Sequence, residues 1–111
     1  MEGFWTVQFA GVQGFGAGVV TLIGGQVFGG DSGYLYTGTY TQQGNNLTIR
    51  IHIKPHAAGV PNVMGRTQFD LGMTGAVQGN TITATGTIPG TQQRLNATLT
   101  KQGSLPPAKA A

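Results

Sequence analysis

The sequence has no cysteine, and only nine of its 111 residues carry a charge. Without cysteine there are no disulfide bonds, no thiolate nucleophiles and no cysteine ligands for zinc. Six basic side chains are too few to neutralise many phosphates, so we expect no dedicated binding of nucleic acid. The three acids, Glu2, Asp31 and Asp70, supply few groups for acid–base chemistry. These shortages favour a non-enzymatic protein that works without a cofactor.

Long apolar runs are absent as well. No apolar segment approaches the roughly 18 residues that a membrane-crossing helix needs. The N-terminus carries Glu2, whereas a secretory signal peptide carries basic residues there. We therefore expect a cytoplasmic protein with no membrane contact. Its length predicts a single domain, which we place at residues 1–102, followed by a flexible tail over residues 103–111.

The chain is rich in glycine, with 20 residues, and in threonine, with 15. Glycine weakens helix interiors, which excludes a helical bundle. Apolar residues alternate with polar ones, most clearly over Asn46–Lys54, and an alternation with period two is typical of a strand with one buried face. The same reasoning predicts eight strands: Gly3–Phe9, Gly16–Ile23, Gln26–Gly30, Tyr34–Thr41, Asn46–Lys54, Thr67–Gly75, Thr81–Ile88 and Arg94–Lys101.

Short links rich in glycine and asparagine join most of these strands, as tight hairpins require. The exception is Pro55–Arg66, a longer loop of the kind that often carries function. Parallel pairing would need long crossovers, for which the chain has no room. We therefore predict an all-β fold, an eight-stranded antiparallel up-and-down barrel. Its interior should contain Trp5, Ile49, Ile51 and Leu71 and be wide enough for side chains or one small ligand.

Few residues qualify as catalytic or metal-binding groups. Asp31 and Asp70 could form a carboxylate pair, but nothing in the sequence brings them together. Ser32 lies in a glycine-rich turn and not in a nucleophile elbow, so we interpret this turn as structural, with Asp31 bonding nearby backbone amides. His52 and His56 flank a strand end, and no third ligand is evident. We predict no metal site and no catalytic residue.

Two features are candidates for protein binding. Arg50, His52 and Lys54 lie on the wet face of one predicted strand and form a basic row that could contact an acidic partner. Phe4 and Trp5 are adjacent, so one of these two rings must point outward. Since outward aromatic residues on a sheet often mark interfaces, we include Phe4 with the basic row as candidate protein-binding residues.

The first forty residues resemble the GrlR-like family, small bacterial β-barrel proteins named after a repressor of type III secretion regulation. The likeness rests on Glu2–Phe9, on Gly16–Gly18, and on Gly29–Tyr40, which includes Gly29, Gly30, Asp31, Ser32, Tyr36 and Gly38. The resemblance implies a lipocalin-like eight-stranded barrel that forms a homodimer and acts by protein–protein contact. The repressor holds its partner through an acidic hairpin, whereas the corresponding Gln42–Asn46 here contains no acid. We therefore carry over no partner-binding residue.

These observations favour a regulator that binds another protein without catalysis. An alternative is a carrier that holds a small apolar ligand inside the barrel. The Gly3-Phe4-Trp5 opening also resembles that of the lipocalins, whose tryptophan closes one barrel end. The carrier hypothesis requires a continuous apolar cavity rather than a solid core. An enzyme would instead require a polar pocket containing Asp31, Asp70 or His52.

Overall fold

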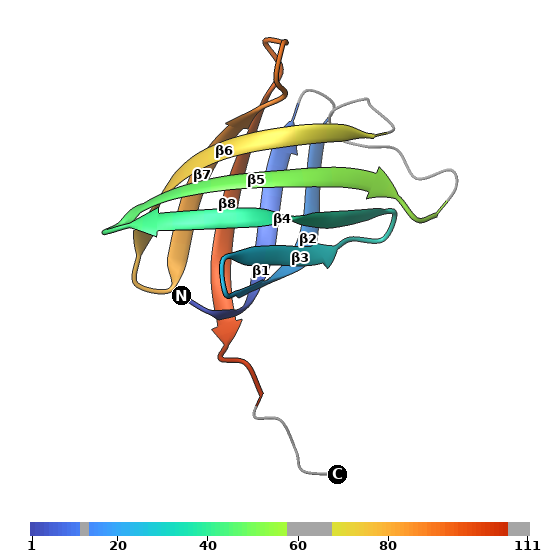
Figure 1. Cartoon of the computed structure of the whole chain (residues 1–111). Helices are drawn as coiled ribbons and strands as arrows, with labels where there is room; N and C mark the ends of the chain where they lie inside the picture. The colour runs from blue at the N-terminus through green and yellow to red at the C-terminus, as the bar shows by residue number, and fades with distance from the viewer. Residues whose placement is uncertain (12–13, 58–67, 107–111) are drawn as a thin grey trace.

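A computed structural model describes residues 1–11, 14–57 and 68–106. Over these ranges the chain forms eight antiparallel strands that close into one barrel, with each strand beside its sequence neighbours and β8 beside β1 (Figure 1). The predicted eight-stranded antiparallel barrel is confirmed. The strands are β1 (Gly3–Gly11), β2 (Gly14–Ile23), β3 (Gln26–Gly30), β4 (Tyr34–Gln43), β5 (Asn46–Pro55), β6 (Phe69–Gln78), β7 (Thr81–Thr87) and β8 (Arg94–Gly103).

Several strands differ in length from the prediction. β6 ends at Gln78 instead of Gly75, because Ala76 and Val77 continue the ladder by pairing with Thr83 and Ile82 of β7. β1 continues past Phe9 to Gly11, and β2 begins at Gly14. Residues 58–67, which include most of the expected loop, and residues 107–111 of the expected tail lie outside the described part of the chain.

The alternation of apolar and polar residues produces the core. In β7 and β8 every second side chain is buried, and the threonines between them are exposed. Trp5, Ile49 and Leu71 are buried, and Ile51 is half-buried with its side chain facing the interior. All four predicted interior residues therefore lie inside the barrel.

One end of the barrel is closed by large side chains. Trp5, Leu22, Leu47 and Ile82 are at most 1% exposed, and each lies close to the β2–β3, β4–β5 or β6–β7 hairpin or to the start of β1. The indole Nε1 of Trp5 donates a hydrogen bond of 3.1 Å to the carbonyl oxygen of Met1. These contacts fill the interior at this end, which we call the closed end.

Two glycines allow the sheet to bend sharply. β4, β5 and β6 cross β1, β2 and β8 at a steep angle (Figure 1). A Cβ atom at Gly38 in β4 would lie 1.9 Å from the carbonyl oxygen of Arg50, and one at Gly29 in β3 would lie 2.0 Å from that of Val19. Neighbouring backbones therefore approach these positions too closely for any side chain, as is common at barrel corners.

The hairpins at the closed end depend on glycine alone. Gly44 and Gly79 have φ of 61° and each begins a two-residue turn, whereas no described non-glycine residue has a positive φ. A two-residue hairpin with glycine at its first central position is typical of a type II′ turn. In both turns the glycine takes the positive φ, and Asn45 and Asn80, which follow it, do not.

Candidate functional site

The barrel contains an internal cavity of about 220 Å³. It extends to the end where Asp31 and Ser32 connect β3 to β4, opposite the closed end. Trp5, at the closed end, is not among the described residues that line it. The lining is mainly apolar and comes from Val7, Phe9, Phe15, Gly16, Ala17, Val20, Leu22, Val27, Tyr34, Tyr36, Ile49, Ile51, Ile53, Phe69, Leu71, Met73, Leu95, Ala97 and Leu99, with Asp31 and Ser32 at its end.

Small residues on β2 position the aromatic wall of this cavity. A Cβ atom at Gly16 would lie 2.4 Å from the ring of Phe9, and one at Gly18 would lie 3.0 Å from the hydroxyl oxygen of Tyr36. The two rings therefore occupy the space that β2 side chains would otherwise fill. They pack edge to face, with centroids 6.4 Å apart and an interplanar angle of 79°. Such a pair is energetically favourable and holds both rings in place.

Asp31 fixes the polar end of the cavity. Its Oδ1 atom accepts hydrogen bonds from the backbone amides of Gly33 (2.9 Å) and Tyr34 (2.8 Å), which confirms the predicted turn. Its Oδ2 atom accepts a hydrogen bond from the hydroxyl of Tyr36. The ring Nε2 of His56 lies 2.9 Å from the backbone carbonyl oxygen of Asp31, to which it donates. Three donors thus hold one carboxylate beside an apolar cavity.

The Tyr36 side chain should make folding sensitive to alkaline pH. Burial raises the pKa of its hydroxyl well above the ordinary value of 10.0, and the hydrogen bond to Asp31 and the carboxylate charge raise it further. The folded protein therefore keeps a proton that the unfolded chain loses. Stability should be complete below about pH 10 and then fall by up to about 1.4 kcal/mol per pH unit as the pH rises. Urea unfolding between about pH 8 and pH 11 measures this slope.

Tyr36→Phe should flatten that slope, although it also lowers stability at neutral pH by removing the bond to Asp31. Tyr40→Phe is the matched control, because Tyr40 is half-buried on the same strand and packs against the same core. An equal alkaline slope in wild type and Tyr36→Phe would show that another group causes it.

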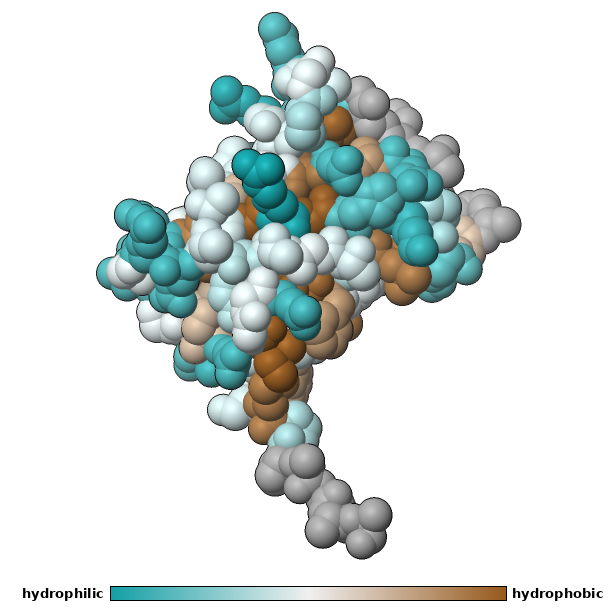
Figure 2. Space-filling view, in the orientation of Figure 1, coloured by the Kyte–Doolittle hydropathy of each residue, from teal (hydrophilic) through white to brown (hydrophobic). Residues whose placement is uncertain are grey.

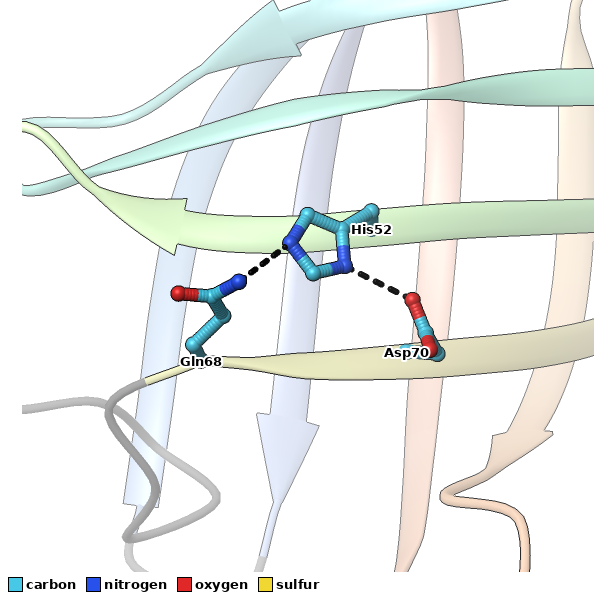
Figure 3. Close-up of polar contacts among 3 residues, drawn as sticks. All are labelled: His52, Gln68 and Asp70. Atoms are coloured by element: carbon cyan, nitrogen blue, oxygen red, sulfur yellow. Dashed lines mark hydrogen bonds and ion pairs between the residues drawn. The ribbon is translucent and has the colours of Figure 1, made fainter.

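A second polar cluster lies on the outer face of β5 and β6. The Nδ1 atom of His52 lies 2.7 Å from Oδ1 of Asp70, and its Nε2 atom lies 2.9 Å from Nε2 of Gln68 (Figure 3). Since the Gln68 amide nitrogen can only donate, His52 Nε2 accepts and Nδ1 carries the proton donated to Asp70. Both ring nitrogens of this tautomer are therefore engaged.

This cluster lacks the geometry of a catalytic centre. Asp70 is 74% exposed on the outer surface, and within the described ranges His52 contacts Asp70 and Gln68 and no hydroxyl that it could activate. Asp70 lies on β6, whereas Asp31 lies at the end of the cavity, so the structure does not join the two acids as a pair. Among the described residues, no three His, Asp or Glu side chains are grouped to hold a metal ion.

The candidate protein-binding residues lie on the outside of the barrel, and one row of cross-strand pairs connects Phe4 with His52. Phe4 pairs with Thr21, Thr21 with Phe28, Phe28 with Thr37, and Thr37 with His52. Arg50 and Lys54 are exposed on either side of His52. The basic row is therefore separated from Phe4 by three strands, and its central member is already paired with Asp70.

Exposed apolar side chains gather on the outer face of β1–β4. Phe4 (42% exposed), Val19, Phe28 and Leu35 form what we call the outer apolar patch, and Phe15, which is 89% exposed, lies outside this patch near the start of β2. Figure 2 shows hydrophobic surface exposed where β1 begins and β8 ends, whereas hydrophilic residues cover the β4–β5 hairpin. The strand pairing places Val19 beside Gly30 and Gly30 beside Leu35. None of these four side chains is charged, and the exposed Lys54, which pairs with Leu35, lies at the edge of the patch.

Sequence reasoning identified some cavity residues and missed others. Ile49, Ile51 and Leu71 line the cavity, and the turn residues Asp31 and Ser32, which we interpreted as structural, also do so. Gly29 and Gly38 allow the sheet to bend, because neighbouring backbone lies too close to them for a side chain. Phe9 and Ala97 also line the cavity; the alternation puts them on the inward faces of their strands, but no pattern in the sequence shows that they border open space.

Neither a scan against protein-family models nor a search of curated proteins found a match for this chain. No helix in the described ranges has the length and apolar character needed to cross a bilayer.

Proposed function

We propose that the barrel binds a small apolar molecule in its interior. The observation that carries this proposal is the cavity of about 220 Å³, whose lining is mostly aliphatic and aromatic. A concave apolar space with a few polar groups at one end is the usual form of a ligand site. A solid core around Ile49, Ile51 and Leu71 would have excluded a ligand, but these side chains border open space.

The volume limits the size of the ligand. Pockets for drug-sized molecules usually measure roughly 300–1,000 Å³, and this cavity is smaller. At roughly 30 Å³ for each water-sized group, the space holds about seven non-hydrogen atoms, so it accommodates most of an eight-carbon chain whose polar group lies at the Asp31 end. A short aliphatic chain fits this description, with its polar end at the Asp31 end of the cavity.

Filling the cavity with a side chain tests the proposal. Ala97 lies on β8, faces inward and lines the cavity, so Ala97→Phe should fill the space and abolish binding of 1-octanol. Thr98→Phe makes the same kind of change on the outer face of the same strand and should leave binding intact. Titration calorimetry measures binding, and thermal unfolding verifies that both variants fold. Undiminished 1-octanol binding by a folded Ala97→Phe, or no binding by wild type, would contradict an interior site.

A second candidate function is binding to another protein chain through the outer apolar patch. Its support is the exposure of Phe4, Val19, Phe28 and Leu35 on neighbouring strands. Because Phe4, Val19, Phe28 and Leu35 are uncharged and Lys54 lies only at their edge, two copies can face each other there with less repulsion than two basic rows would have. A homodimer is the simplest such assembly, and a regulator acting by protein contact, as the GrlR-like resemblance implies, could use it.

A charge placed in this patch tests the dimer. Phe28→Lys puts a cation in the contact from each copy and should convert a dimer to a monomer in light scattering. Thr74→Lys adds the same charge on the exposed outer face of β6, away from the patch, and should leave the dimer unchanged. A wild-type protein that stays monomeric across the concentration range would overturn this second candidate.

A further inference from the structure

The polar groups at the end of the cavity are few, and Asp31 carries the one charge among the described residues that line it. We propose that the ligand of the barrel is a short aliphatic primary amine, whose ammonium group binds Asp31 while its chain fills the apolar cavity. This inference rests on the proposed interior site and names the chemical class of its ligand. It derives from the geometry of the Asp31 carboxylate, from the absence of an opposing charge in the described lining, and from the size of the cavity.

Asp31 has a fixed orientation and an unused acceptor position. A carboxylate offers about four acceptor positions, two on each oxygen. The amides of Gly33 and Tyr34 occupy both positions on Oδ1, and the Tyr36 hydroxyl occupies one on Oδ2. One position on Oδ2 remains for a further donor. Because the three bonds already hold the carboxylate, a ligand need not order it on binding, which lowers the entropic cost.

The charge around the cavity selects against acids. Asp31 is the one charged side chain among the described residues that line the cavity, and all other lining side chains are neutral. The bound carboxylate of a fatty acid would lie near that of Asp31, and no cation stands between them among the described lining residues. His56 is a described basic group beside Asp31, but its Nε2 binds the Asp31 backbone carbonyl and not the carboxylate. An ammonium group, by contrast, both donates hydrogen bonds and neutralises the charge.

The apolar walls dictate the rest of the ligand. Ile49, Ile51 and Leu71 face the cavity from β5 and β6, and Phe9 and Tyr36 form the aromatic wall. Neither group offers a second charged partner deep in the barrel. A molecule with one polar end and an unbranched chain therefore fits, whereas a diamine would bury an unpaired cation at considerable cost.

Three ligands with the same chain length test the proposal on the wild-type protein. Octylamine, 1-octanol and octanoate differ in the polar end alone. We expect octylamine to bind about three- to tenfold more tightly than 1-octanol. We expect octanoate to bind at least about tenfold more weakly than octylamine. Raising the salt concentration should weaken octylamine binding and leave 1-octanol binding unchanged, because salt screens partly exposed charges.

Asp31→Asn provides the matched variant. The amide keeps an acceptor oxygen for the turn but has no charge, so the preference for octylamine over 1-octanol should disappear while 1-octanol binding persists. If this variant does not fold, the salt dependence and the ligand series on wild type still decide. Binding of 1-octanol or octanoate at least as tight as that of octylamine overturns the amine proposal and leaves the interior site standing. No binding of any of the three overturns the interior site itself.

Discussion

Replacement of Gly38 by alanine is expected to destabilise the barrel by at least about 3 kcal/mol. The added Cβ would lie 1.9 Å from the Arg50 carbonyl oxygen and 2.8 Å from the Ile51 Cα. Both neighbours are backbone atoms in the middle of the β4–β5 ladder, so no side-chain rotation relieves the clash. The strands must separate at this point. Urea unfolding followed by far-UV circular dichroism measures the loss.

Gly72→Ala is the matched control for this prediction. Gly72 also lies in the interior of a strand, but a Cβ atom there would meet nothing within 4 Å. Alanine reduces the freedom of the unfolded chain more than that of the strand, so we expect a change of about 1 kcal/mol or less. Equal unfolding midpoints for the two variants would show that the bend at Gly38 tolerates a side chain.

Replacement of Trp5 by alanine is expected to cost about 3–5 kcal/mol, which is the usual range for removing a large buried aromatic residue. Trp5 is 1% exposed and fills the closed end with Leu22, Leu47 and Ile82. Its loss leaves a void and removes the bond to the Met1 carbonyl. Because Trp5 is the only tryptophan, circular dichroism must replace tryptophan fluorescence in the unfolding measurement.

Phe4→Ala controls for the removal of a neighbouring aromatic ring. Phe4 is 42% exposed on the opposite face of β1, so the expected loss is about 1 kcal/mol. If Trp5→Ala and Phe4→Ala lowered stability equally, Trp5 would not be the residue that closes this end.

The fold could be predicted from the sequence because its determinants are local. The alternation over Asn46–Lys54 sets which side chains face inward, and the short glycine turns exclude every pairing except hairpins. Strand ends were less predictable. β6 extends to Gln78 because Ala76 and Val77 have partners in β7, and a partner strand is not visible in the sequence of β6 itself.

The cavity could be predicted only in outline. Its aromatic wall depends on the pairing of Phe9 with Gly16, which lets the ring lie over β2. The role of Asp31 illustrates a different limit. Its bonds within the turn follow from local sequence, whereas its position beside the cavity depends on how the whole barrel closes. Volume left between side chains of distant strands has no local sequence pattern.

The pairing of the first strand with the last has a consequence for how the chain acquires its fold during synthesis. Val7 in β1 pairs with Leu99 in β8, so β1 has only one of its two neighbours until β8 has left the ribosome. Contacts between distant segments form slowly, since a long stretch of chain must first be brought together. The nascent sheet therefore keeps two open edges, and these edges are sites for pairing with other chains until β8 arrives.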